Sequence, residues 1–360
     1  MKIGVITFHR APNCGAALQT YGLFEFLRLK GHDVEIIDYI PNNLAYVKRG
    51  KIRGILHVIK QIVTPVESKR FKAKEKAFIK FRENNLKLSK VKYLGDNEIE
   101  KGEFNYDLVI SGSDQILNTT LTGDSKAYYL HFTNSKKVSY ASSFGRTDIS
   151  NTEREFIKDY LVKFDQISVR EKSAGKIVNE LIKVDSSLVC DPVFLMSPQE
   201  WMSKIEQSVN LHDYIFVYLM EENENTDAII DAIETKYHMP FITVIGGKVS
   251  KKYSNRDFAC GPDKFINYIY NAKYVITNSF HASAFSIIFG KQFWTVAHSC
   301  RNTRLENLFE IIDAESKLVN NLIKVEELDK YVVNGHMAYN NMQGLIENSR
   351  EYLIRLLKAD

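Results

Sequence analysis

Four short polar stretches stand out as places where chemistry could occur, because each follows an apolar, strand-like run. They are residues 9–19, 110–115, 168–173 and 276–286. Arg170, in the third stretch, carries a planar guanidinium that can bind a carboxylate or a phosphate through two hydrogen bonds. His281, in the fourth, carries an imidazole that changes charge near neutral pH and suits general acid–base catalysis. The pattern predicts a site for an anionic substrate and proton transfer.

The other two stretches offer backbone N–H groups and polar side chains that could contact a ligand. Gly15 opens a predicted helix after a polar loop, where free N–H groups can bind an anion, and Gln19 lies one turn later. Asp114 and Gln115 follow a strand, a Ser and a Gly, which allow a sharp turn. His9 follows the first strand-like run and is a second candidate acid.

Each stretch also has a simpler explanation. Gly15 could serve close packing at the start of a helix, and Asp114 could be an N-cap. Arg170 could form an exposed ion pair with Glu171, which would contribute little stability. His281 could be a packed core histidine. The sequence leaves these alternatives open.

An alternation of strands and helices must position these stretches. Apolar, β-branched runs predict strands at 2–8, 34–39, 107–110, 138–141, 167–169, 214–219, 241–245, 274–277 and 293–297. Apolar residues at helical spacing predict helices at 15–30, 151–163, 171–182 and 338–358, and others that begin near 223, 262, 280 and 302. This βαβ pattern is typical of parallel sheets, which bind ligands beyond the carboxyl ends of their strands.

The pattern divides the chain into two α/β domains that we expect to face each other across a cleft. We predict an N-terminal Rossmann-like domain at 1–192 and a C-terminal one at 193–335. A C-terminal helix at 336–360 is expected to pack back on the first domain. Asp191-Pro192 is interpreted as the turn that joins the domains.

A basic helical insertion at about 48–85 interrupts the first domain. Residues 48–82 contain twelve Lys and Arg against two Glu, so the net charge of +4 arises in this segment. An apolar stripe beside these charges suits contact with an anionic membrane surface. The alternative is a pair of helices that bury one face in the protein and expose the basic face to water.

Composition excludes several classes of protein. The chain has 360 residues, of which 44% are hydrophobic and 26% charged, as in ordinary globular proteins. We find no run of about 18 apolar residues and no signal peptide, so we expect a cytoplasmic protein, peripheral at most to the inner face of the membrane. The four cysteines form no CxxC pair, and we expect no metal and no nucleic-acid partner.

The ordered set of motifs resembles the polysaccharide pyruvyl transferase family. The matching stretches are Asn13–Tyr21, Ser111–Asn118, Ser139–Gly145, Ile167–Glu171, Asp191–Phe194, Gly261–Phe265 and Thr277–His281. The resemblance implies two Rossmann-like halves, as in the two-domain (GT-B type) glycosyltransferase fold. It also implies transfer of a pyruvyl group from phosphoenolpyruvate, without a cofactor, to sugars of bacterial capsules, exopolysaccharides or cell-wall polymers, often on a lipid carrier.

The chain departs from better-studied members at three places. Ser279 stands where they carry an arginine, Leu117 where they carry a tryptophan, and Ala282 where they carry a glycine. The first departure implies that another cation, Arg170 or Arg304, meets the donor.

These observations assign roles to ten residues. We expect His281 and Asp114 to be catalytic, and the donor to be bound by Arg170, Asn278, Ser279 and Arg304. The remaining residues line the cleft or bind the acceptor: Gly15, Gln19, Gln115 and His9. Two other functions remain open, a glycosyltransferase that uses a nucleotide sugar and a non-catalytic binding protein.

Overall fold

The computed structural model describes residues 1–42, 65–204, 212–245, 255–299 and 302–358. The chain divides into two compact units. Unit 1 comprises residues 1–195 and 346–360, and unit 2 comprises residues 196–345.

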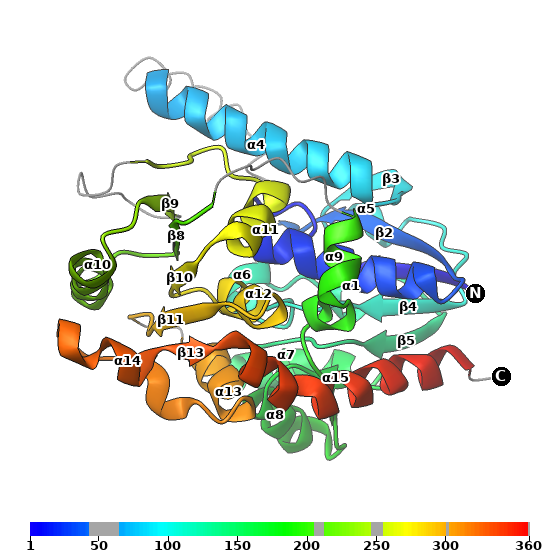
Figure 1. Cartoon of the computed structure of the whole chain (residues 1–360). Helices are drawn as coiled ribbons and strands as arrows, with labels where there is room; N and C mark the ends of the chain where they lie inside the picture. The colour runs from blue at the N-terminus through cyan, green and yellow to red at the C-terminus, as the bar shows by residue number, and fades with distance from the viewer. Residues whose placement is uncertain (43–64, 205–211, 246–254, 300–301, 359–360) are drawn as a thin grey trace. The chain divides into compact units, whose positions relative to one another are not determined.

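Unit 1 is built on a five-stranded sheet whose order is β3-β2-β1-β4-β5 (Figure 1). All four pairings are parallel, so the carboxyl ends of these strands share one edge. The strands are β1 (Lys2–Ile6), β2 (Asp33–Ile40), β3 (Leu88–Leu94), β4 (Leu108–Ser111) and β5 (Lys136–Ser139). The order places β1 at the centre, where Ile3, Val5 and Ile6 are fully buried.

Helices connect the strands of unit 1 as the βαβ pattern predicts. They are α1 (Cys14–Leu29), α4 (Pro65–Asn85), α5 (Asp96–Ile99), α6 (Thr119–Thr122), α7 (Asn151–Leu161) and α8 (Lys172–Ile182). Helix α1 begins because the side chain of Asn13 accepts a hydrogen bond from Ala16 N at 3.1 Å. Two short strands, β6 (Ser168–Val169) and β7 (Ser187–Leu188), form a separate parallel pair.

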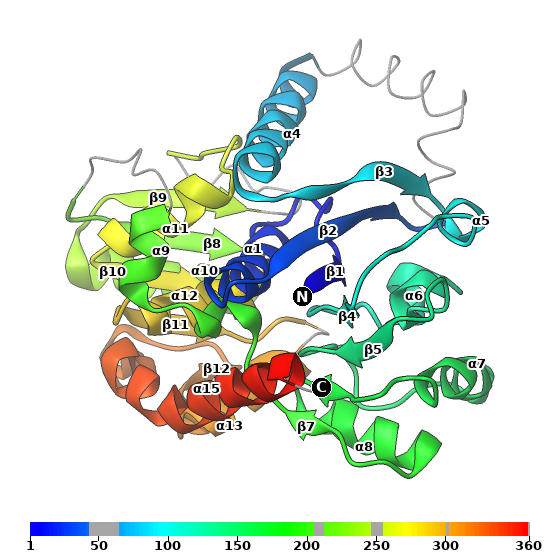
Figure 2. The same ribbon diagram turned by 90° about the vertical axis from the view of Figure 1, so that its right-hand side faces the viewer.

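Helix α4 is the part of the basic insertion that the structure describes, and residues 48–64 of the insertion lie outside the described residues. Near its C-terminal end α4 buries Phe78 and Phe81, and Phe81 packs edge-on against Tyr21 of α1. Its N-terminal part is exposed, and 54% of Phe71 is accessible to solvent. In Figure 2, this part of α4 extends beyond β3, away from the sheet of unit 1.

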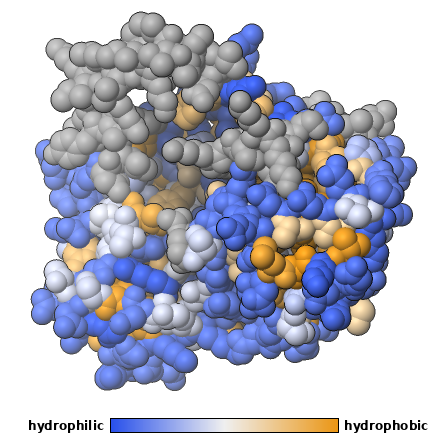
Figure 3. All heavy atoms as spheres, turned by 90° about the vertical axis from the view of Figure 1, so that its left-hand side faces the viewer, coloured by the Kyte–Doolittle hydropathy of each residue, from blue (hydrophilic) through white to orange (hydrophobic). Residues whose placement is uncertain are grey.

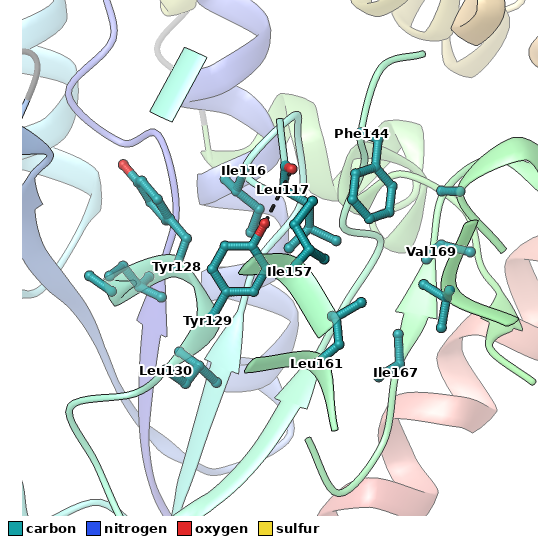
Figure 4. Packing of buried hydrophobic residues seen from close by; sticks show 14 of the residues in the cluster. Ile116, Leu117, Tyr128, Tyr129, Leu130, Phe144, Ile157, Leu161, Ile167 and Val169 are labelled. Atoms are coloured by element: carbon teal, nitrogen blue, oxygen red, sulfur yellow. Dashed lines mark hydrogen bonds between the residues drawn. The ribbon is translucent and has the colours of Figure 1, made fainter. Parts of the chain in front are cut away.

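The core of unit 1 is dense in aromatic and branched residues (Figure 4). Ile157 and Leu161, four residues apart on α7, point into it, as helical spacing predicts. Tyr129 is fully enclosed but keeps its hydroxyl satisfied by donating to Leu117 O at 3.3 Å. This core supports the loops that follow β4, β5 and β6.

Unit 2 contains a second, mostly parallel sheet whose order is β12-β11-β10-β8-β9, with β13 antiparallel to β11. The strands are β8 (Ile215–Leu219), β9 (Phe241–Ile245), β10 (Tyr274–Thr277), β11 (Gln292–Val296), β12 (Leu318–Val319) and β13 (Val333–Asn334). Its helices include α9 (Pro198–Lys204), α10 (Glu224–Tyr237), α11 (Pro262–Asn271), α12 (Phe280–Ile288), α13 (Thr303–Ile311) and α14 (Leu328–Tyr331). Ile276, Trp294 and Val217 are wholly buried in its core.

The last helix, α15 (Gly335–Lys358), begins in unit 2 and ends in unit 1. In unit 1, Ser349 Oγ accepts a hydrogen bond from Cys190 N at 2.8 Å, and Arg350 donates to Leu195 O at 2.8 and 3.0 Å. Within the described ranges, no helix has both the length and the apolar character needed to cross a bilayer. On the face drawn in Figure 3, apolar residues form separate patches among hydrophilic ones.

Candidate functional site

The loops after β4, β5 and β6 meet at the carboxyl edge of unit 1. Isolated parallel bridges join Asp114 to Ser142 and Ser142 to Val169, so the sheet pairing continues beyond the named strands. Asp114 and Ala141 adopt left-handed backbone conformations, with φ of 79° and 53°. Such conformations are costly for residues other than glycine and persist where the surrounding contacts fix them. These loops are therefore held in one arrangement.

Arg170 lies in this arrangement among three carboxylates. Its guanidinium forms a hydrogen-bonded ion pair with Asp191, and lies 3.5 Å from Asp114 Oδ1 and 3.8 Å from Glu171 Oε2. Glu171 in turn accepts from Ser143 Oγ at 2.6 Å. Only 3% of the Arg170 side chain is exposed. Burial opposes its charge, but the three carboxylates outweigh burial and raise the pKa of Arg170.

Two of the simpler explanations for these residues are wrong. Arg170 and Glu171 do not form an exposed pair, because both side chains are buried. Asp114 does not cap a helix, since the next helix is α6 and its cap is Asn118, which accepts from Thr120 N. Asp114 Oδ1 instead accepts from Gln115 N at 2.9 Å.

Gln115 is nearly buried, and it lies next to Gly145, whose backbone adopts a left-handed conformation. Its Oε1 accepts from Asn118 Nδ2 at 3.1 Å. A Cβ on Gly145 would lie only 2.3 Å from Gln115 Cδ, so a glycine is required both by the close approach and by its φ of 66°. The expected role of Gln115 toward an acceptor stays a prediction.

Gly15 and Gln19 lie in α1, and both are buried. Gln19 Nε2 donates to Thr7 Oγ1 at 3.0 Å, and Thr7 Oγ1 donates to Ser113 O at 2.9 Å. Gln19 is wholly enclosed, so in unit 1 it links α1 to the loops after β1 and β4. Its expected place in the lining of a cleft stays a prediction.

His9 is also enclosed, and each ring nitrogen faces an oxygen. Nε2 lies 3.0 Å from Asp38 Oδ1, and Nδ1 lies 3.1 Å from Thr7 O. Arg10 binds both oxygens of Asp38. Burial opposes the charge of Asp38, but the hydrogen bonds from Arg10 and His9 hold its pKa well below the usual range.

In unit 2, the junction between β10 and α12 is fixed by neutral hydrogen bonds. Asn278 Oδ1 accepts from Met220 N at 2.7 Å, and its Nδ2 donates to Glu221 O at 2.9 Å. Thr277 Oγ1 accepts from Ser279 N at 3.0 Å. Ser279 is the N-cap of α12, but its side chain makes no capping bond in the part of the chain that the structure describes.

His281 is the second residue of α12, and 6% of it is exposed. Its ring packs edge-on against Phe280 with 5.1 Å between centroids. Arg304 is the second residue of α13 and is partly exposed. Because β10 and β11 are parallel neighbours, α12 and α13 follow the same edge of the sheet. Unit 2 thus holds His281, Asn278, Ser279 and Arg304 along one edge, and unit 1 holds the other candidates.

The sequence analysis missed two charged groups at these edges. Asp191, interpreted as part of a joining turn, is buried and is the ion-pair partner of Arg170. Glu221, after β8, lies 3.3 Å from His298 Nε2 and accepts from Ser299 N at 2.5 Å. Burial opposes the charge of Glu221, but these contacts lower its pKa. Asp191 and Glu221 both come shortly after a strand. A charged residue at the end of an apolar run is the sequence signal that could have identified them.

The residues that the structure describes contain no group of three or more His, Cys, Asp and Glu arranged to hold a metal ion. Cys300 lies outside those residues.

Solved structures similar to this chain share a two-domain fold. The UDP-GlcNAc 2-epimerase of Neisseria meningitidis bound to UDP-GlcNAc has a TM-score of 0.53 at 10% identity, covering 100% of both chains. The UDP-GlcNAc 2-epimerase of Methanocaldococcus jannaschii, in complex with UDP-GlcNAc and UDP, has a TM-score of 0.53 at 16% identity and covers 99% of both. A glycosyltransferase from Rickettsia africae has a TM-score of 0.52 at 13% identity, covering 100% of this chain and 99% of its own.

These likenesses establish the fold alone, and they confirm the prediction of two Rossmann-like halves of the GT-B type. None of the curated proteins compared with the chain matches it. The model of one family, polysaccharide pyruvyl transferase, matches residues 13–299, which is most of the chain and includes every predicted site residue except His9 and Arg304. The chain belongs to the polysaccharide pyruvyl transferase family.

Proposed function

We propose that the protein transfers the pyruvyl group of phosphoenolpyruvate to a sugar in a bacterial surface-polysaccharide precursor. The product is a cyclic pyruvyl ketal, and phosphate is released. The observation that carries the proposal is His281, a nearly buried histidine in the first turn of α12, next to the fixed Asn278 and inside the family match.

The chemistry sets clear requirements. A proton adds to the terminal alkene carbon of phosphoenolpyruvate and leaves an oxocarbenium-like centre at the neighbouring carbon. A sugar hydroxyl attacks this centre and gives its proton to a base. The carbon–oxygen bond to phosphate then breaks, and a second hydroxyl closes the ring as its proton departs. The enzyme needs a general acid, a base near the hydroxyls, and groups that bind the donor's anions.

His281 is our choice for the acid, because an imidazole can donate and recover a proton near neutral pH. Asp114 is our choice for the base, since its side chain is 13% exposed whereas Asp191 and Glu171 are enclosed. On the acceptor side we keep Gly15, Gln19, Gln115 and His9.

For the donor we keep Asn278, Ser279, Arg304 and Arg170. Of the two cations that could replace the arginine absent at 279, Arg304 is favoured. Arg304 follows the same edge of the unit 2 sheet as Ser279. The charge of Arg170 already faces three carboxylates, which a donor anion would have to displace or join.

The test is a direct assay. The purified protein is incubated with phosphoenolpyruvate and lipid-linked oligosaccharides, while phosphate release and the mass of the sugar product are followed. The proposal requires phosphate release that depends on the acceptor and a product heavier by one pyruvyl ketal. A parallel reaction with UDP- or GDP-sugars tests the glycosyltransferase alternative, and sugar transfer there without pyruvyl transfer would contradict the proposal.

We further propose that α4 contacts an anionic membrane surface. Its exposed N-terminal part carries Lys69, Arg70, Lys72 and Lys76 around the exposed Phe71. Each basic group near an anionic surface contributes about 1 kcal/mol, and salt screens the attraction. We expect the protein to float with anionic liposomes at low salt and less at moderate salt. Equal binding to neutral liposomes, or none to either, would discard the idea.

A further inference from the structure

A histidine and a glutamate meet across the end of β10 in unit 2. Glu221 lies two residues beyond β8, and His298 lies two residues beyond β11. The strand order β11-β10-β8 places β10 between them (Figure 1). Neighbouring strands lie about 4.8 Å apart, so β8 and β11 are separated by roughly 10 Å. His298 Nε2 nevertheless lies 3.3 Å from Glu221 Oε2, because both side chains reach toward the strand between them.

Two asparagines fix the backbone on either side of this pair. Asn302, the N-cap residue of α13, accepts from His298 N at 2.7 Å and donates to His298 O at 2.8 Å. On the other side, Asn278 Nδ2 donates to Glu221 O at 2.9 Å. Asn278 is one of the residues expected to bind the donor. The pair is therefore held partly by the side chain that also fixes the junction between β10 and α12.

The carboxylate of Glu221 is fully engaged. Its Oε1 accepts from Ser299 N at 2.5 Å and from Asn223 Nδ2 at 3.3 Å, and its Oε2 accepts from Ser299 Oγ at 2.9 Å. Burial opposes the charge of Glu221, but these hydrogen bonds and the nearby His298 lower its pKa. An ionised carboxylate beside one ring nitrogen orients an imidazole and stabilises its protonated form. A proton exchanged with a substrate would then pass through Nδ1 of the ring.

Its place and its exposure distinguish this pair from the other histidine–carboxylate pairs that the described residues contain. The ring of His9, which faces Asp38, is fully enclosed. His131, which faces Glu100, is accessible but precedes β5, whereas ligands of parallel sheets bind beyond the carboxyl ends of strands. The side chain of His298 is 15% exposed and follows a strand. It can therefore meet a ligand at the edge where unit 2 holds its other candidates.

We propose that His298 transfers the proton that accompanies the departure of phosphate, and that Glu221 is its positioning residue. The proposal rests on the proposed function, in which the donor is bound in unit 2 and this step has no assigned group. Attack by the first sugar hydroxyl leaves an adduct in which one carbon carries a sugar oxygen and the phosphate oxygen.

The bond from that carbon to the phosphate oxygen breaks, and its electron pair stays on the oxygen, which takes a proton from the protonated ring of His298. The second hydroxyl forms the new carbon–oxygen bond and gives its proton to the now neutral ring. His298 thus ends the cycle in the form in which it began, and the products are phosphate and the ketal.

Binding of inorganic phosphate, the expected product, tests the contact without turnover. The histidine ring signals of the full chain are followed by NMR as phosphate is added at constant pH. The signal of His298 is the one that is absent from His298→Asn, and we expect it to move and to saturate. The signal of His131, identified with His131→Asn, is the matched control because its ring also faces a glutamate, at 2.7 Å. A His298 signal that phosphate does not move would overturn the proposal.

The step itself is tested in single-turnover reactions with phosphoenolpyruvate and the acceptor, analysed by mass. His298→Asn should slow phosphate release about 10²–10⁴-fold, and the adduct, a sugar heavier by one phosphoenolpyruvate, should accumulate. His281→Asn should yield little adduct, since it blocks an earlier step, and His131→Asn should match the wild type. Glu221→Gln should slow release less than His298→Asn does, and Glu221→Asp, which keeps a carboxylate, should recover part of that loss.

The outcomes separate this proposal from the proposed function. Release at the wild-type rate by His298→Asn, slow release without the adduct, or a loss of turnover that only follows the folded fraction in thermal unfolding would overturn the role of His298 alone. A wild-type chain whose His298 signal responds to phosphate, but which never transfers a pyruvyl group, would contradict the proposed function and this step with it. Only the contact between His298 and phosphate would then be supported.

Discussion

The carboxyl edges of the two sheets use polar side chains in different ways. In unit 1, buried charges hold the loops: Arg170 faces Asp191, Asp114 and Glu171. In unit 2, the junction after β10 is fixed by neutral groups, chiefly the amide of Asn278. The nearby His281 is nearly buried in the first turn of α12.

In the proposed function, the residues that hold the loops of unit 1 differ from the residue of unit 2 that transfers a proton. The guanidinium of Arg170 is paired with carboxylates and holds the loops around it in place. It stays charged at any physiological pH. In the proposed function, proton transfer is assigned to His281 instead.

The largest effect on stability should follow removal of the unit 1 cation. Arg170→Gln would leave three carboxylates close together with no guanidinium between them. Breaking a buried ion pair in this way costs about 3–5 kcal/mol in the free energy of unfolding. Chemical denaturation measures this cost.

Arg154→Gln is the control, since its partners Asp148 and Glu180 are 78% and 55% exposed and such pairs contribute about 1 kcal/mol or less. A cost for Arg170→Gln as small as that of the control would contradict the description of the unit 1 edge.

A smaller effect is expected at the neutral junction of unit 2. Asn278→Ala removes the acceptor of Met220 N and the donor to Glu221 O. Leaving a buried polar group unsatisfied costs about 1–3 kcal/mol. Denaturation of this variant should therefore give a loss below that of Arg170→Gln, and the reverse order would break the comparison.

The stability of the unit 1 edge should also depend on pH. The pKa of Asp38 is lowered in the folded protein, so its contribution to stability is present above the unfolded pKa of about 4 and is lost as pH falls below that value. Asp38→Asn should therefore cost stability at pH 7 and progressively less as the pH falls below about 4. A cost that does not change with pH would show that the charge of Asp38 contributes nothing.

Much of the fold could be predicted from the sequence, because apolar runs and helical spacing are local signals. Strand β10 begins and ends at the predicted residues, and helix α12 begins at Phe280, where a helix start was predicted. Strand β3 was missed, because it is a largely exposed edge strand in which Lys90 and Lys92 interrupt the apolar residues. Helix α15 begins at Gly335, three residues before the predicted start.

The ion pairs between side chains far apart in the sequence could not be predicted from the sequence. Asp191 meets Arg170 across 21 residues, and Asp38 meets Arg10 across 28. Such pairs arise only when separate strand ends come together at one edge of a sheet. The sequence identified Arg170 as important but could not indicate that its charge is balanced within the protein.

The most direct test of the account is the pH–rate profile of His281→Asn with phosphoenolpyruvate and a sugar acceptor. Asparagine keeps the approximate size and a donor but cannot transfer a proton. We predict a loss of turnover of about 10²–10⁴-fold, little change in donor affinity, and loss of one limb of the profile. A variant that melts early but turns over normally per folded molecule, with both limbs intact, would contradict the role of His281.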